Sequence, residues 1–134
     1  MEPCVIYFSR TGNTKRAGEA IANAVDAPLL DITSSDLSVT KKHDLLIIGT
    51  PVEAFKPAKE TLESIERLPN AENKKVILFC TYRLYKGSVF KALENALSAK
   101  GYTCIANASK KGMKPDKPAD FTDLIAKIKK YITA

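Results

Sequence analysis

Residues 4–25 read CVIYFSRTGNTKRAGEAIANAV, and this stretch holds a complete strand, turn and helix. Cys4–Phe8 is short, rich in β-forming residues and apolar on both faces, which is typical of a strand buried on both sides. From Thr14 to Val25, alanine, isoleucine and valine recur at helical spacing. The stretch therefore predicts a buried strand that leads through a tight polar turn into a covering helix.

Apolar runs and helical segments continue to alternate along the chain. Further strands are expected at residues 28–32, 45–49, 75–81 and 102–108, and further helices at 58–68, 88–100 and 119–131. Residues 33–42 are ambiguous and leave open a short helix that begins at Ser35 or Asp36. Strands that are apolar on both faces and are separated by helices indicate a parallel sheet with both faces covered. We therefore predict one α/β domain over residues 1–134, with a doubly wound, five-stranded parallel sheet in three α/β/α layers.

Composition narrows the classes of function. The chain carries 21 Lys and Arg against 15 Asp and Glu, a formal charge of +6, which favours an anionic partner. Nucleic acid is the weaker choice, because we find no zinc-finger spacing, no RNA-binding aromatic pattern and no arginine-dense helix. No apolar run approaches the roughly 20 residues that span a bilayer, so we predict no membrane insertion. A single His argues against His-based triads and metal sites, and we predict no catalytic residue and no metal.

The three cysteines suggest where the protein works. Cys4, Cys80 and Cys104 each lie inside an apolar run, and the sequence has no CxxC motif. Buried cysteines of this kind are typical of reduced core thiols. We therefore expect a cytoplasmic protein without disulfide bonds.

The turn after the first strand is the strongest candidate binding site, and it comprises Ser9, Arg10, Thr11, Gly12, Asn13 and Thr14. In doubly wound sheets, ligands bind beyond the carboxyl ends of the strands. The turn also opens a helix, whose first N–H groups have no partner within the helix and attract a phosphate. A simpler interpretation stays open, in which these side chains only cap the helix and the glycine only serves the turn. The turn matches neither the P-loop nor the GxGxxG pattern.

Residues 5–25, VIYFSRTGNTKRAGEAIANAV, resemble the N-terminal signature of the flavodoxin family, whose TGNT loop holds the phosphate of FMN. Residues 41–65, KKHDLLIIGTPVEAFKPAKETLESI, and residues 76–102, VILFCTYRLYKGSVFKALENALSAKGY, resemble the family's third and fourth strands and its flavin loops more weakly. The resemblance implies the strand order 2-1-3-4-5, FMN as a non-covalent cofactor, and a role as a one-electron carrier.

The resemblance also implies which residues contact the cofactor. Besides the phosphate turn, the first flavin loop supplies Thr50, Pro51, Val52, Glu53, Ala54 and Phe55. The second flavin loop, residues 81–87, supplies Thr81, Tyr82, Arg83, Tyr85, Lys86 and Gly87. Phe55, Tyr82 and Tyr85 are the aromatics available to flank the flavin ring, with plain packing or exposure as the alternative. Relatives often carry an aromatic in place of Glu53 and glycines in place of Phe55 and around Arg83. Without glycine, a positive φ in the first loop costs more.

Cations gather in the segments expected at this edge of the sheet: Arg10, Lys56, Arg83, Lys86, Lys110, Lys111, Lys114 and Lys117. A basic rim differs from the acidic rim that is common in the family. It predicts redox partner proteins with an acidic docking face, and a merely solvated lysine surface is the alternative. We expect a monomer or a weak dimer.

Three functions remain open from the sequence. The first is an FMN electron carrier, with the flavin as its sole redox centre. The second is an FMN-dependent oxidoreductase linked to a quinone or to NAD(P)H, but no second nucleotide loop is visible. The third is a flavodoxin-fold binding module that holds no flavin, which the missing glycines near Phe55 and Arg83 keep open.

Overall fold

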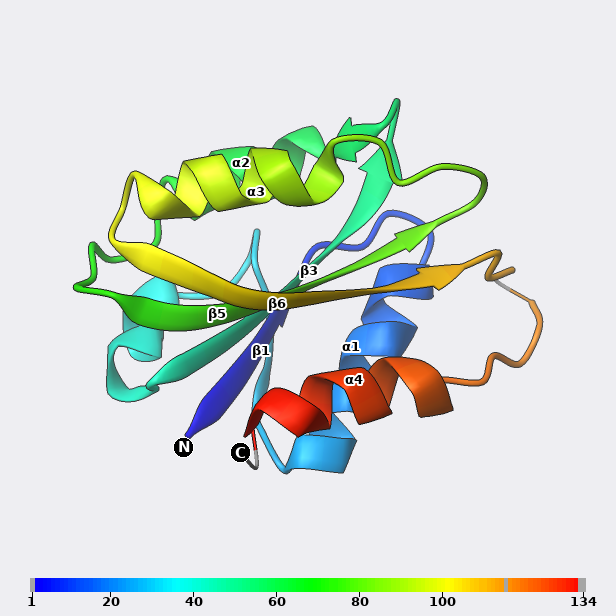
Figure 1. The fold of residues 1–134 in the computed structure, drawn as a ribbon, viewed down its shortest axis with the longest axis horizontal. Coiled ribbons are helices and arrows are strands. Elements are labelled where there is room, and N and C mark those ends of the chain that lie inside the picture. The colour runs from blue at the N-terminus through cyan, green and yellow to red at the C-terminus, as the bar shows by residue number, and fades with distance from the viewer. Residues whose placement is uncertain (1, 115, 133–134) are drawn as a thin grey trace.

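A parallel sheet forms the centre of the protein, and helices cover both of its faces (Figure 1). The computed structural model describes residues 2–114 and 116–132. The strands are β1 (Pro3–Tyr7), β2 (Leu29–Asp31), β3 (Leu45–Glu53), β4 (Lys56–Pro57), β5 (Lys74–Tyr82) and β6 (Tyr102–Lys111). The helices are α1 (Asn13–Val25), α2 (Lys59–Ile65), α3 (Val89–Ser98) and α4 (Thr122–Ile132), with a short 3-10 helix η1 (Leu37–Lys42).

The strand order confirms the doubly wound arrangement. The parallel strands follow the order β2-β1-β3-β5-β6, which is the predicted 2-1-3-4-5 once the short β4 is set aside. The additional strand β4 pairs antiparallel with β3 and belongs to a hairpin that the sequence analysis did not predict. Helices α1 and α4 cover one face of the sheet, and α2 and α3 cover the other (Figure 1).

Two apolar cores lie on the two faces of the sheet. Alternate side chains of a strand point to opposite faces, so neighbours in β3 serve different cores. Ile48 packs in the core that includes Leu93 of α3, whereas Ile47 packs in the core that includes Ile21 of α1 and Ile128 of α4. All five side chains are almost completely buried. This double burial explains why the strands read as continuous apolar runs.

Several elements end elsewhere than predicted. Strand β3 continues past the expected end at Gly49 as far as Glu53, and β6 continues past Ala108 to Lys111. Both extensions keep a partner, since Pro51 still pairs with Thr81 and β6 stays paired with β5 to its end. As a result, most of the predicted first flavin loop is strand.

The ambiguous region before β3 does contain a helix. Helix η1 follows Asp36, and the carboxylate of Asp36 accepts a hydrogen bond from the backbone N–H of Ser38 at 3.0 Å. This local side-chain bond selects Asp36 rather than Ser35 as the cap.

The three cysteines are free thiols, as expected. Cys4 and Cys80 are fully buried in the core, whereas Cys104 is half-buried and packs against the edge of the same core. Within the described part of the chain, no helix is long and apolar enough to cross a membrane.

Candidate functional site

A cavity of about 690 Å³ lies where four parallel strands end. Its walls come from the last residues of β3 and β5 and from the segments after β1, β5 and β6, and the volume falls within the range of cofactor pockets. The lining residues are Arg10, Thr11, Asn13, Pro51, Val52, Glu53, Thr81, Tyr82, Arg83, Leu84, Gly112, Met113, Lys114 and Asp116. The cavity therefore occupies the edge at which doubly wound sheets bind ligands.

The turn before α1 presents backbone donors at this cavity. Gly12 has a φ of 97°, and its N–H donates to Ser9 Oγ at 3.0 Å. A Cβ built on Gly12 would meet no heavy atom within 4 Å, so the space beside the turn is open. Among residues 2–114 and 116–132, no acceptor faces the backbone N–H groups of Asn13, Thr14 and Lys15. Free N–H groups at the positive end of a 13-residue helix favour an anion.

The segment after β6, residues 112–114 and 116–117, folds back over the start of α1. Arg16 donates from Nη1 to the carbonyl of Lys114 at 3.0 Å and from Nη2 to the carbonyl of Lys117 at 2.6 Å. Asn13 Nδ2 donates to the carbonyl of Met113 at 3.3 Å. Met113 is thereby buried, and Lys114 joins the cavity wall. The Asn13 amide, predicted as a phosphate donor, serves here to hold this segment.

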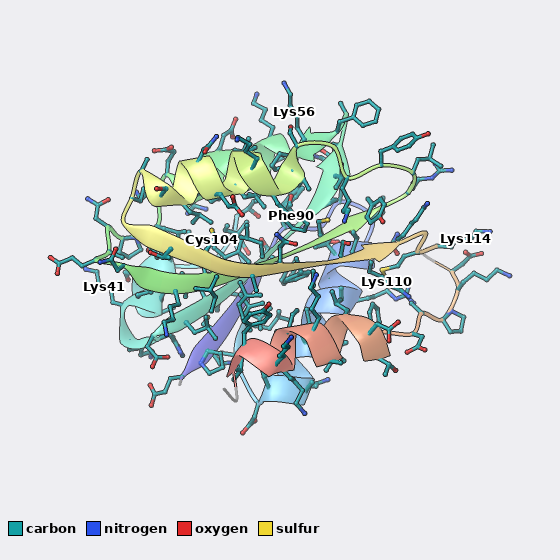
Figure 2. The ribbon with its side chains drawn as sticks, viewed as in Figure 1. Lys41, Lys56, Phe90, Cys104, Lys110 and Lys114 are labelled. Carbon is teal, nitrogen blue, oxygen red and sulfur yellow. The ribbon has the colours of Figure 1, made fainter. Side chains whose placement is uncertain are left out.

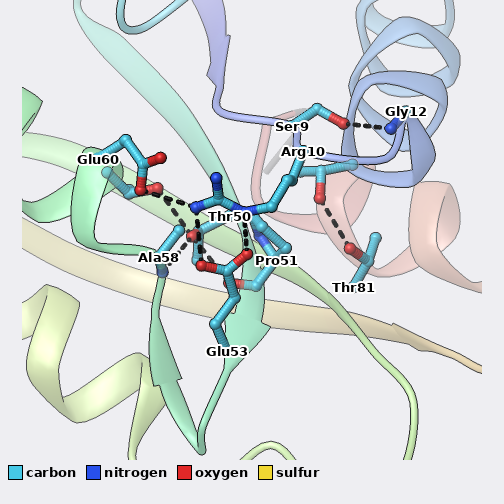
Figure 3. Close-up of polar contacts among 11 residues, drawn as sticks. Ser9, Arg10, Gly12, Thr50, Pro51, Glu53, Ala58, Glu60 and Thr81 are labelled. Atoms are coloured by element: carbon cyan, nitrogen blue, oxygen red, sulfur yellow. Dashed lines mark hydrogen bonds and ion pairs between the residues drawn. The ribbon is translucent and has the colours of Figure 1, made fainter.

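Arg10 links the turn to two other elements instead of remaining a free cation. Its guanidinium holds both carboxylate oxygens of Glu53, at 2.5 and 2.9 Å, and one oxygen of Glu60, at 2.8 Å (Figure 3). The hydrogen bond from Arg10 lowers the pKa of Glu60, and the Glu60 backbone N–H adds to this effect. Because two carboxylates face one guanidinium, Arg10 brings no net positive charge to the cavity.

Two buried pairs of hydroxyl groups fix the ends of the strands. Thr14 Oγ1 lies 2.8 Å from Thr81 Oγ1, which ties α1 to β5 (Figure 3). Thr50 Oγ1 lies 2.8 Å from Thr61 Oγ1 and accepts from the N–H of Ala58 at 3.2 Å, which ties β3 to α2. Neither Thr14 nor Thr50 lines the cavity, so the structure gives both residues a positioning role.

The turn between β3 and β4 has an unusual backbone. Ala54 and Phe55 have φ values of 51° and 66°, and they stand between the paired residues Glu53 and Lys56. Two central residues with positive φ define a type I′ hairpin turn, which normally uses Asn-Gly. Ala54 and Phe55 therefore adopt the positive φ that was expected to cost free energy in a loop without glycine.

The predicted aromatic walls are only partly formed. Phe55 is 58% exposed and Tyr85 is 67% exposed, and neither lines the cavity. Their rings contact each other instead, with centroids 6.1 Å apart. Tyr82 is half-buried and does line the cavity, together with Pro51 and Val52. The apolar wall is therefore built from β3 and β5 themselves more than from the loops beyond them.

The second predicted loop is fixed by a close approach to this turn. The N–H of Ser88 donates to the carbonyl of Phe55 at 3.0 Å. Gly87 has a φ of 59°, and a Cβ there would lie 2.3 Å from the same carbonyl oxygen. Gly87 thus permits packing of the backbone against the hairpin and does not line the cavity.

The structure brings together half of the 18 predicted site residues. Those that line the cavity are Arg10, Thr11, Asn13, Pro51, Val52, Glu53, Thr81, Tyr82 and Arg83. Those outside its lining are Ser9, Gly12, Thr14, Thr50, Ala54, Phe55, Tyr85, Lys86 and Gly87. Leu84, inside the second predicted loop, and Lys114, in the predicted basic rim, also line the cavity, whereas the prediction missed Gly112, Met113 and Asp116. These three residues follow the fifth parallel strand, beyond whose end ligands are also expected to bind.

Known proteins share this arrangement. A family model described as "Flavodoxin domain" matches residues 4–113. A flavodoxin of Clostridium beijerinckii is 27% identical over 113 residues, which cover 75% of this chain and 78% of that protein. The solution structure of two-electron reduced Megasphaera elsdenii flavodoxin superimposes with a TM-score of 0.75 at 24% identity, covering 95% of this chain and 98% of that one.

The fold also occurs as part of a larger protein. Rubredoxin oxygen:oxidoreductase from Desulfovibrio gigas matches with a TM-score of 0.76 at 16% identity, covering 96% of this chain but 34% of that one. A likeness at this identity concerns the fold alone. The match of the family model across residues 4–113, on a chain with this sheet order, shows that the protein belongs to the flavodoxin domain family.

Proposed function

We propose that this protein binds FMN non-covalently in the cavity and carries electrons between redox proteins, with the flavin as its only redox centre. The observation that carries the proposal is the open turn at Gly12, where free backbone N–H groups meet a cavity large enough for a cofactor. Family membership supports the same cofactor class.

The charges around the cavity suit a phosphate at the α1 end. Arg83 and Lys114 are the cations that line the cavity besides Arg10. Asp116 is the lining carboxylate that is not paired with Arg10. Glu53 also lines the cavity, but Arg10 compensates its charge. Together with the N–H groups of α1, these cations make the cavity as a whole favourable for an anion such as a phosphate.

The other end of the cavity suits a flat apolar ring. Pro51, Val52, Tyr82 and Leu84 are apolar lining residues from β3, β5 and the segment after β5, and Met113, on the segment that folds over α1, lines the same cavity. A hydrogen bond of 2.8 Å from the N–H of Gly112 to the carbonyl of Tyr82 joins the segments of Met113 and Tyr82. Bound FMN would supply the redox chemistry, while the chain binds it, orients it and excludes water from one side.

The cysteines support a flavin as the sole redox centre. Burial raises the pKa of Cys80 to about 12 and that of Cys104 to about 11, so both stay protonated thiols at neutral pH. Protonated, buried thiols are poor nucleophiles and poor redox groups. Free thiols also fit a reducing compartment, and we place the protein in the cytoplasm.

An FMN-dependent oxidoreductase is the second candidate. The fold is compatible with this function, since it makes up about a third of a protein named as an oxidoreductase from Desulfovibrio gigas. As an oxidoreductase, the loaded protein would accept hydride from NAD(P)H directly and pass electrons to a small acceptor such as a quinone. As a carrier, it would exchange electrons with other redox proteins and react only slowly with NAD(P)H.

A visible absorption spectrum tests both candidates. We expect the purified chain, mixed with FMN and freed of excess by gel filtration, to keep the yellow flavin absorption. Anaerobic addition of NADPH alone should leave that absorption unchanged, whereas NADPH with a catalytic amount of a flavodoxin reductase should bleach it. A colourless protein after gel filtration would contradict FMN binding, and rapid bleaching by NADPH alone would favour the oxidoreductase.

A further inference from the structure

Three exposed apolar side chains, Phe55, Leu84 and Tyr85, lie on two adjoining segments beside the cavity, and together they are called the cluster. Phe55 is 58% exposed, Leu84 is 69% exposed and Tyr85 is 67% exposed, whereas most large apolar side chains of the described chain are buried. They come from two segments, the β3–β4 turn and the segment after β5, that meet through the contact of the Phe55 and Tyr85 rings. Large apolar groups held together in water mark an interaction site more often than a random surface.

The backbone holds this cluster in a defined position. The carbonyl of Phe55 accepts the N–H of Ser88, and the close approach of Gly87 to the same carbonyl leaves no room for a side chain there. Phe55 and Ala54 both take a positive φ without being glycine. Such conformations cost free energy and persist where the surroundings require them, often at ligand clamps. The fold therefore retains a strained turn that leaves the aromatic ring of Phe55 exposed to solvent.

The charges beside the cluster have one sign. Lys56 adjoins Phe55, while Arg83 and Lys86 flank Leu84 and Tyr85, and all three cations are exposed. None of the three forms an ion pair within the described residues. The nearby carboxylates of Glu53 and Glu60 face Arg10 and are compensated by it (Figure 3). A partner that covers the cluster must therefore meet an apolar centre with a cationic border.

The cluster also adjoins the proposed redox centre. Arg83 and Leu84 line the cavity on one side and belong to the same segment as Tyr85 on the other. The other labelled lysines are distributed around the molecule: Lys110 and Lys114 lie at the cavity end, and Lys41 lies at the opposite end (Figure 2). A protein seated on the cluster would therefore reach the mouth of the cavity.

We propose that the Phe55–Leu84–Tyr85 cluster is the docking surface for a protein partner whose contact face has an apolar centre bordered by carboxylates. The redox part of this assignment rests on the proposed electron-carrier function. A second copy of this chain is a poor occupant, because it would oppose Lys56, Arg83 and Lys86 to identical cations. Single-stranded nucleic acid offers bases and negative charge, but it does not match the aliphatic Leu84 or the tilt of 46° between the two rings.

The test is an NMR titration of the 15N-labelled full chain with two probe proteins. One probe is a plant-type [2Fe–2S] ferredoxin, an acidic one-electron carrier, and the other is cytochrome c, a basic one. Ferredoxin should perturb the backbone signals of residues 54–56 and 83–88. Its dissociation constant should increase as the ionic strength rises. Cytochrome c should bind at least tenfold more weakly. Signals perturbed mainly on α4, no ferredoxin binding, or equal binding of both probes would overturn the proposal.

Matched variants separate the apolar contribution from the charge. Phe55→Asn with Tyr85→Ser should weaken ferredoxin binding at least tenfold, and asparagine still tolerates the positive φ. Val39→Ser removes another exposed apolar group at a distant position and should change the affinity less than twofold. Lys86→Glu should weaken binding at least fivefold more than Lys127→Glu, which changes the net charge equally. Equal effects within either pair would contradict the proposed surface.

Two further readouts keep the docking surface distinct from the proposed function. FMN binding is measured separately by quenching of flavin fluorescence. Ferredoxin docking at the cluster by a chain that binds no FMN would leave the surface standing and remove the electron-carrier function, whereas FMN binding with docking elsewhere would do the reverse. A 10-nucleotide single-stranded DNA that displaces ferredoxin from the cluster at lower concentration, or self-association abolished by the double variant, would assign the surface to another occupant.

Discussion

The two ends of the cavity are built on different physical principles. At the proposed phosphate end, the N–H of Gly12 donates to Ser9 Oγ, and Asn13 and Arg16 donate to carbonyls of the segment after β6. At the proposed ring end, the β3–β4 turn carries positive φ at Ala54, and the side chains beyond it are largely exposed. One end is held by hydrogen bonds between side chains and backbone groups. The other end includes a turn whose backbone is strained.

From this difference we expect cofactor affinity and partner contact to depend on different ends of the cavity. The phosphate end offers preorganised donors, so binding an anion there requires little rearrangement. The ring end offers strand residues as walls and presents its loop aromatics, Phe55 and Tyr85, to solvent. We therefore expect the phosphate end to dominate cofactor affinity, and the ring end to govern stability of the turn and contact with partners.

The largest expected effect is a charge placed at the phosphate end. Gly12→Asp should weaken FMN binding about 100-fold relative to Gly12→Asn, because a carboxylate would repel the phosphate at short range. Both side chains have the same size and both tolerate a positive φ, so the comparison isolates the charge. Flavin fluorescence quenching measures the two affinities. Equal affinities would mean that the phosphate does not bind at this turn.

The next effect concerns the segment after β6. Arg16→Met removes the donors to the carbonyls of Lys114 and Lys117, so that segment should open and FMN affinity should fall about tenfold. Lys15→Met, an exposed neighbour on the same helix, is the control and should leave both properties unchanged. Hydrogen exchange of residues 112–114 should rise only in the Arg16 variant. Unchanged exchange there would show that Arg16 does not hold the segment.

A smaller effect should appear in stability at the ring end. Ala54→Gly should raise the free energy of unfolding by about 1 kcal/mol, because glycine adopts the observed φ of 51° without steric cost. This corresponds to a Tm higher by about 3 °C. Ala20→Gly, inside α1, should destabilise by about the same amount. If both substitutions destabilise the protein, the turn is not strained.

The smallest effect concerns Arg10, whose guanidinium pairs with Glu53 and Glu60. Arg10→Met should return the pKa of Glu60 toward its ordinary value of 4.5, since Arg10 is the main cause of its lowering. A lowered pKa means that this carboxylate stabilises the fold above pH 4.5 and that the contribution is lost as pH falls through the folded-state pKa. Carboxyl 13C NMR titration measures it, with Lys59→Met as the control. A Glu60 pKa unchanged by Arg10→Met would remove the bridge from the account.

The sequence predicted the turn before α1 but not the hairpin between β3 and β4, and the difference has a physical reason. A turn such as residues 9–14 is read from local chemistry, because hydroxyls, an amide and a glycine before a helix specify their own geometry. The parallel sheet was equally readable from its apolar runs. By contrast, the hairpin at Ala54 and Phe55 arises although its residues disfavour it, because β3 and β4 pair and Gly87 packs against it.

Tertiary partners also decided the roles of single residues. Arg10 reads as a phosphate ligand, but its partners Glu53 and Glu60 lie 43 and 50 residues away. Thr50 reads as a loop residue, but its hydroxyl is paired with Thr61 in the core. The segment after β6 is held at the cavity by Arg16 and Asn13, which lie about 100 residues earlier in the chain, and by the carbonyl of Tyr82. Such long-range pairs leave no local pattern in one sequence.

The most direct test of the central claim is a calorimetric titration of the unmodified protein with FMN and with riboflavin, which lacks the phosphate. If the open turn at Gly12 binds the phosphate, FMN should bind at least 100-fold more tightly, and its affinity should fall as salt rises while that of riboflavin does not. Equal affinities for the two flavins, or no heat of binding with either, would contradict the account.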